Sequence, residues 1–139
     1  MLRAWTRVAG SDAWGLRSFS AATGVATVGL LGLLTARMIG RVTGLVTAGL
    51  AAVHPLHVHY SQEARAYALW CLVVTLLLSF LIRAGQTLRW RWWAAYALTA
   101  LLAVMTHDYT VFLLPATAGA ALVASDKRRF LRWWLAVHA

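Results

Sequence analysis

The stretch AYALWCLVVTLLLSFLI, residues 66–82, decides the fold, because it carries no charged side chain and is rich in leucine and valine. A second uncharged stretch, SFSAATGVATVGLLGLLTA, covers residues 18–36. A helix crosses the hydrocarbon core of a bilayer, about 30 Å thick, with roughly 20 mainly apolar residues. Both stretches are therefore predicted to be transmembrane helices.

Three more apolar stretches extend this pattern, at residues 42–53, 92–105 and 109–124. Pro55 follows the first of them and is expected to end or kink that helix, because proline lacks an amide hydrogen and clashes with the preceding turn. Another helix is expected to begin at Trp133. The sequence thus predicts an all-α, multi-pass transmembrane helical bundle of about five spans.

The first 17 residues differ from the rest, because they are amphipathic rather than apolar. Leu2, Trp5, Val8 and Ala9 recur at helical spacing, which is typical of a helix that lies in the membrane interface. Asp12 is a candidate cap for the helix that follows. The predicted domains are an interfacial segment, 1–17, and a transmembrane helical domain, 18–139.

Composition supports a membrane protein. Hydrophobic residues make up 61% of the chain and charged residues 12%, against about 45–50% and about 25% in soluble domains. The net charge of +9 does not indicate nucleic-acid binding, because the basic residues stand in short clusters between apolar stretches. Cys71 is the sole cysteine, so no disulfide framework is expected.

The basic clusters also predict an orientation. Segments 37–41, 83–91 and 126–132 hold nine of the 13 lysines and arginines, and cytoplasmic loops are enriched in these residues. The N-terminal segment, the loop 54–66 and the turn at His107 then face the outside. Because the chain would begin outside and stop within a helix, we expect it to be a piece of a larger membrane domain. The predicted location is the cell (inner or plasma) membrane.

Two polar clusters stand at the outer ends of the predicted spans. One is YSQEARAY, residues 60–67, and the other is THDY, residues 106–109. If the first opened the third helix, Glu63 would lie in its first turn and share a face with Tyr67. The clusters are expected to converge with Arg17 in a wet pocket at the outer leaflet. Arg17 and Arg65 suit a phosphate, which arginine grips through two hydrogen bonds.

Each cluster has a structural alternative. Glu63 is also explained by an ion pair with Arg65 or Arg17. His107 and Asp108 form half of an acid/base pair or, with no nucleophile identified, a helix cap. The histidines at 54, 57 and 59 are weak metal ligands without a carboxylate at metal spacing, so we predict no metal site and no cofactor. The pair Gly40 and Gly44 predicts a close helix contact.

Four segments, taken in order, resemble one known family: LRSFSA (16–21), GRVTGL (40–45), HPLHVHYSQEARAYAL (54–69) and THDY (106–109). The chain resembles the polytopic GT-C glycosyltransferases of the protein O-mannosyltransferase and aminoarabinose-transferase type, especially their bacterial RgtA/B/C/D-like members. The long third segment is the specific one. Asp108 departs from the commonest form of the fourth.

The resemblance implies an enzyme that moves a sugar from a polyprenyl-phosphate carrier to a lipid, glycan or protein acceptor on the outer face of the membrane. It places the catalytic aspartate in an outer loop upstream of this chain, so the catalytic residue is unknown here. It assigns substrate binding to matching or neighbouring positions, which are Arg17, Tyr60, Gln62, Glu63, Arg65, Tyr67, His107, Asp108 and Tyr109.

Two other functions fit a multi-pass membrane chain. A transporter or flippase-like module would carry polar or glycine- and proline-broken sites near the middle of its spans. A non-catalytic membrane subunit would use its polar residues for packing and topology alone. Polar clusters gathered on one membrane face favour the enzyme.

Overall fold

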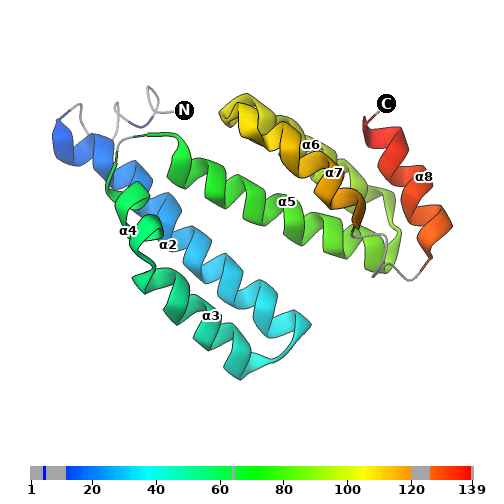
Figure 1. Ribbon diagram of the computed structural model, residues 1–139, viewed down its shortest axis with the longest axis horizontal. Helices are drawn as coiled ribbons and strands as arrows, with labels where there is room; N and C mark the ends of the chain where they lie inside the picture. Colours follow the sequence, from blue (N-terminus) through cyan, green and yellow to red (C-terminus); the bar gives the residue numbers. More distant parts are fainter. Residues whose placement is uncertain (1–4, 6–11, 64, 120–125, 139) are drawn as a thin grey trace. The chain divides into compact units, whose positions relative to one another are not determined.

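The computed structural model describes residue 5 and residues 12–63, 65–119 and 126–138. Within these ranges the chain is helical and contains no strand (Figure 1), which confirms the all-α class. Among the described residues, two helices are long and apolar enough to cross a membrane, at Arg17–Met38 and Tyr67–Thr87. The chain divides into two compact units, Met1–Leu72 and Val73–Ala139.

The first unit is built on a helical hairpin. Helix α2, Ala13–Met38, begins where Asp12 accepts a hydrogen bond from the Gly15 amide at 2.9 Å, as predicted for a cap. Helix α3, Arg41–Val53, then runs back along α2 (Figure 1). The turn between them needs Gly40, whose φ of 147° is unfavourable for residues with a side chain.

Small residues bring α2 and α3 into close contact. A Cβ on Gly44 would lie 2.6 Å from the Gly32 carbonyl oxygen and 2.5 Å from the Ala36 Cβ. A Cβ on Gly32 would lie 2.9 Å from the Ala48 Cβ. Such small residues let helix backbones approach closely in membranes. The close contact predicted for the pair Gly40 and Gly44 is therefore confirmed at Gly44 and wrong at Gly40, where a Cβ would meet nothing within 4 Å.

Pro55 separates α3 from α4, Pro55–Gln62. His54 has extended backbone angles, φ −66° and ψ 122°, as expected for a residue that precedes proline. Pro55 itself occupies the first turn of α4, where its missing amide hydrogen costs nothing. The chain then turns and enters α5, Tyr67–Thr87.

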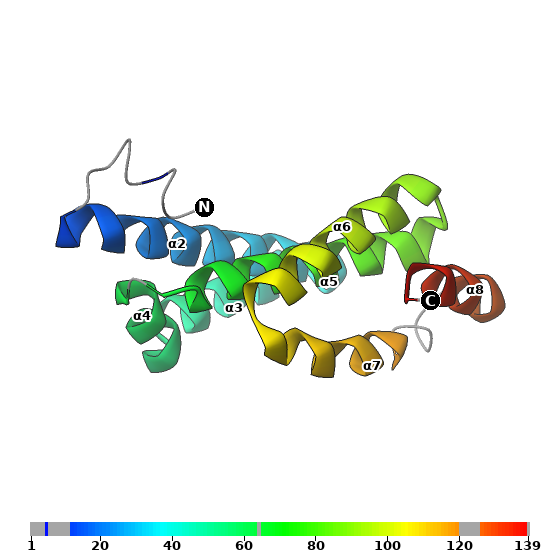
Figure 2. The same ribbon diagram turned by 90° about the horizontal axis from the view of Figure 1, so that it is seen from above.

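The second unit holds the rest of α5 and the remaining helices, which are α6 (Trp90–Thr106), the 3₁₀ helix η1 (Asp108–Phe112), α7 (Leu113–Ala118) and α8 (Lys127–His138) (Figure 2). Its largest buried side chains are Trp93, Tyr96, Phe130, Leu77 and Leu81. The Trp93 ring lies 5.1 Å from that of Phe130 and 6.3 Å from that of Trp133. Aromatic packing thus joins α6 to α8.

Some segment boundaries differ from those predicted. Most of the expected interfacial segment lies outside the described residues, and α2 already begins at Ala13. Residues 108–112 form a 3₁₀ turn before α7, so the described part of the fifth stretch is not one continuous α-helix. Residues 127–132, expected as a loop, belong to α8, because Asp126 accepts the Arg129 amide at 3.0 Å and starts the helix.

Candidate functional site

The first polar cluster lies at the junction of α4 and α5. Tyr60 and Gln62 end α4, Glu63 follows as its C-cap, and Tyr67 begins α5. Glu63 therefore does not lie in the first turn of the third predicted helix, and the helix face that it would then share with Tyr67 does not form. The stretch from Pro55 makes a short helix of its own, and Glu63 has the extended angles φ −84° and ψ 138°.

A histidine and an arginine flank the Glu63 carboxylate. Its Oε1 lies 3.3 Å from His59 Nε2, and its Oε2 lies 3.6 Å from Arg65 Nε. The second distance is too long for a good hydrogen bond, and within the described residues the buried Oε2 accepts none. The side chain of Glu63 is 31% exposed and that of Arg65 is 67% exposed. Arg65 therefore keeps most of its donors free for a ligand from outside.

Aromatic rings frame the same junction. The Tyr60 ring lies 4.8 Å from the Tyr67 ring and 5.3 Å from the His59 ring. The contact between the two tyrosine rings bridges the end of α4 and the start of α5, on either side of Glu63 in the chain. Four of the predicted binding residues, Tyr60, Glu63, Arg65 and Tyr67, thus lie together in the first unit.

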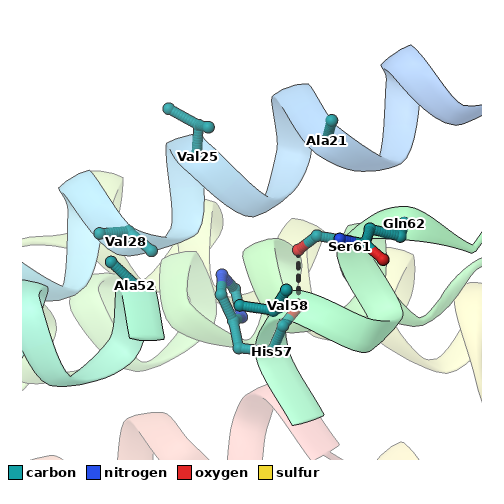
Figure 3. A pocket seen from close by; sticks show the side chains of 8 residues that line it. All are labelled: Ala21, Val25, Val28, Ala52, His57, Val58, Ser61 and Gln62. Atoms are coloured by element: carbon teal, nitrogen blue, oxygen red, sulfur yellow. Dashed lines mark hydrogen bonds between the residues drawn. The ribbon is translucent and has the colours of Figure 1, made fainter. Parts of the chain in front are cut away.

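Two cavities adjoin this cluster. One has a volume of about 410 Å³ and is lined by Ala21, Val25, Val28, Ala52, His57, Val58, Ser61 and Gln62. Figure 3 shows its α2 residues spaced along one helix, across from the polar side chains of α4. The other has a volume of about 260 Å³ and is lined by His54, Leu56, His57, Tyr60, Ser61, Ala68 and Cys71. The linings of both cavities are largely apolar, and His57 and Ser61 contribute to each of them.

The packing of α4 on α2 sets the position of these walls. His57 Nε2 donates to the Gly24 carbonyl oxygen at 3.2 Å, and the Ser61 hydroxyl donates to the His57 carbonyl oxygen at 2.7 Å. A Cβ on Gly24 would collide with the Ser61 side chain. The predicted binding residues did not include His57, Ser61 or Gly24. The four-residue spacing of His57 and Ser61, one turn of helix, was the available signal.

Arg17 lies on the exposed surface of α2. Within the described residues it forms no ion pair, and Glu63 pairs with Arg65 and His59 instead. Arg17 precedes Gly24 on α2 by about two helical turns, or roughly 10 Å of rise. The alternative of an ion pair between Glu63 and Arg17 is therefore wrong, whereas the pair with Arg65 is confirmed.

The second polar cluster has a capping role. His107 ends α6 and precedes η1, and its Nδ1 accepts the Tyr109 amide at 3.3 Å. The His107 and Tyr109 rings lie 4.8 Å apart, while Asp108 is exposed. The cap expected for His107 is confirmed. This cluster belongs to the second unit, so its convergence with Glu63 and Arg17 stays a prediction.

The described residues contain no group of three or more histidine, cysteine, aspartate or glutamate side chains that could hold a metal ion. Of the three histidines considered as metal ligands, at 54, 57 and 59, two contact protein groups instead. His57 contacts the Gly24 carbonyl oxygen, and His59 contacts Glu63. His54 precedes the first turn of α4.

Comparison with known proteins gives one match that spans nearly the whole chain. Residues 1–138 match the family model described as dolichyl-phosphate-mannose-protein mannosyltransferase. No curated protein and no solved structure matches. That family consists of GT-C type glycosyltransferases of membranes that use a polyprenyl-phosphate sugar. The chain belongs to the dolichyl-phosphate-mannose-protein mannosyltransferase family.

Proposed function

We propose that this chain is part of a multi-pass enzyme of the plasma membrane, with about five spans in these residues. The enzyme transfers a sugar from a polyprenyl-phosphate donor to a lipid, glycan or protein acceptor on the outer face. Family membership supports glycosyl transfer. The donor site is the α4–α5 junction, and no residue of this chain is assigned as the catalytic base.

One observation carries the assignment of the donor site. Arg65, two-thirds exposed, stands beside a half-buried Glu63, and apolar cavities adjoin the same short helix. A polyprenyl phosphate matches this arrangement, because it has an anionic head for the arginine and an apolar chain for the cavities. Arginine binds phosphate through charge-assisted hydrogen bonds, and the cavity of about 410 Å³ offers the apolar chain a surface away from water.

The polar residues of the junction have separate roles in this proposal. Arg65 binds the phosphate and steadies the negative charge that grows as the sugar leaves. Glu63 positions Arg65 through the contact between its Oε2 and the Arg65 Nε. Tyr60, Gln62 and Tyr67 line the approach to the sugar. Arg17 adds positive charge at the N-terminal end of α2.

The residues His107, Asp108 and Tyr109, also predicted to bind substrate, lie in the second unit. Tyr109 is 65% exposed, which leaves its ring available to stack on a sugar. Asp108 is exposed and has no assigned role in proton transfer. No cofactor is proposed, because neither the residues of the junction nor the sugar chemistry requires one.

The test measures sugar transfer in membranes that contain the full gene product. The probe is polyprenyl-phosphate mannose labelled in the sugar, and the readout is label retained in the acceptor fraction. Arg65→Ala should raise the KM for this donor by about tenfold or more, the size of one lost charged hydrogen bond. The control is Arg37→Ala, which removes an exposed arginine at the far end of α2.

Three outcomes decide the proposal. A higher KM with Arg65→Ala and an unchanged KM with Arg37→Ala supports a donor site at the junction. Equal KM values for both variants and the parent place the donor elsewhere. No transfer by the parent from any polyprenyl-phosphate sugar tried, in membranes where a second family member is active, favours a non-catalytic subunit.

A further inference from the structure

Helix α8 is fixed on the second unit by one of its faces. Phe130 is fully buried. Trp134 Nε1 donates to the Thr117 hydroxyl at 2.9 Å, and the Tyr96 hydroxyl lies 3.1 Å from His138 Nε2. His138 Nδ1 also lies 2.8 Å from the Trp134 carbonyl oxygen. These contacts determine which side of α8 faces away from α6 and α7.

The outward face of α8 mixes arginine with leucine. Arg128 and Arg132 are exposed and lie one turn apart. Leu131 and Leu135, also one turn apart, are 41% and 58% exposed. One face of α8 already packs on protein. The leucines exposed on its other face therefore form an apolar surface that is available for a second contact.

The positive charge on α8 is unbalanced. Lys127, Arg128, Arg129 and Arg132 are all exposed, and none forms an ion pair within the described residues. They occupy the first half of the helix, where the helix dipole disfavours cations. Arg128 and Arg132 also repel each other at this spacing. An external anion would relieve both effects.

More positive charge lies at the same end of the second unit. The Trp93 ring stacks 6.3 Å from the Trp133 ring, and this places the start of α6 beside α8. Arg89 and Arg91, both exposed, flank that start. Positive charge at this end of the second unit therefore extends beyond α8 itself.

We propose that the outward face of α8 lies on the headgroups of a bilayer that contains anionic phospholipid. Leu131 and Leu135 enter the boundary between headgroups and acyl chains, and Arg128, Arg129 and Arg132 contact lipid phosphates. Mixed basic and apolar faces of this kind bind anionic membranes. The helix is thus an interfacial element, and Trp133, where a helix was expected to begin, lies inside it. This surface is independent of the proposed donor site.

The experiment places a probe on this face in the full chain. Cys71, the sole cysteine, is replaced by serine, and Leu135→Cys is spin-labelled. The protein is reconstituted into vesicles of phosphatidylcholine alone or phosphatidylcholine mixed with phosphatidylglycerol. Accessibility of the label to oxygen and to a water-soluble nickel complex then reports its depth. We expect a deeper label in the anionic vesicles, and high salt should reverse the shift.

Charge-removal variants make the test specific. Arg128→Gln with Arg132→Gln should lower the ratio of inserted to free label by about fivefold for each arginine removed. Arg37→Gln with Arg41→Gln removes two exposed arginines from the α2–α3 turn and should leave the ratio unchanged. If the α8 variant does not fold, the lipid and salt comparison on the labelled parent decides the question.

Two results would overturn the proposal. Equal exposure to the nickel complex in neutral and anionic vesicles means that the face stays in water. A label shielded from both oxygen and nickel in every vesicle means that protein covers the face, as in contact with a second copy of the chain.

Discussion

The imidazole Nε2 of His57 on α4 lies 3.2 Å from the carbonyl oxygen of Gly24 on α2. This contact joins residues 33 positions apart and holds α4 against the first long apolar helix. Because Tyr60, Ser61 and Glu63 follow within two turns, the contact also sets the position of the predicted donor site. His57, which belongs to the specific segment 54–69, therefore acts through packing.

Because the Ser61 side chain lies so close to Gly24, adding a methyl group at Gly24 should lower the stability of the protein. Gly24→Ala should destabilise the protein by about 1–3 kcal/mol, the usual cost of an overpacked contact. Ser61 cannot turn away freely, because its hydroxyl is bonded to the His57 carbonyl oxygen. Thermal unfolding in detergent, followed by tryptophan fluorescence, measures the effect as a lower Tm.

Gly29→Ala is the matched control on the same helix. A Cβ there meets nothing within 4 Å, and alanine favours a helix over glycine by roughly 0.5–1 kcal/mol. The control should therefore leave Tm unchanged or raise it. Equal losses of Tm in the two variants would show that α4 does not pack on Gly24.

A second glycine tests the hairpin of α2 and α3. Gly44→Ala would bring a methyl group to 2.6 Å from the Gly32 carbonyl oxygen, and backbone atoms cannot move aside as a side chain can. The two helices must separate, so a loss of about 2–3 kcal/mol is expected. Gly49→Ala, on the same helix with nothing within 4 Å, should cost nothing. An unchanged Tm for Gly44→Ala contradicts the close packing.

Tyr96 tests how α8 is held. Its hydroxyl lies 3.0 Å from the Thr117 Oγ1 and 3.1 Å from His138 Nε2, and the side chain is fully buried. Tyr96→Phe should cost about 1–3 kcal/mol, because it leaves buried polar partners behind. Increased proteolysis near residues 126–138 is the specific readout of a loosened α8.

The same chemical change at an exposed site controls for this variant. Tyr109 is 65% exposed, so Tyr109→Phe should alter neither Tm nor the proteolysis pattern. If Tyr96→Phe behaves like Tyr109→Phe, the hydrogen bonds of the Tyr96 hydroxyl do not hold α8 in place.

Much of the helical pattern could be predicted from the sequence, because it depends on apolar stretches and on local breakers. The α3–α4 break follows from Pro55, and the start of α2 follows from Asp12. The start of α8 was missed. A run of basic residues was interpreted as a loop, although Asp126 caps it and Phe130 is buried against α6.

The site was harder to predict because it depends on tertiary contacts. The motif 60–67 was identified, and the pair of Glu63 with Arg65 was one of its alternatives, but the sequence did not show that Glu63 leaves the helix and contacts His59. Nor could it place His57 on Gly24, since a backbone carbonyl carries no sequence signature. Packing between distant helices decides both features.

The most direct test of the donor site is photolabelling of the full protein in membranes with a polyprenyl phosphate that carries a diazirine on its apolar chain. Mass spectrometry then maps the labelled peptides. We expect labels within residues 21–28 and 57–62, which line the cavity beside the junction. Unlabelled polyprenyl phosphate and Arg65→Ala should suppress them, whereas Arg37→Ala should not. Labelling that resists competition, or that is confined to other segments, would contradict a donor site at the α4–α5 junction.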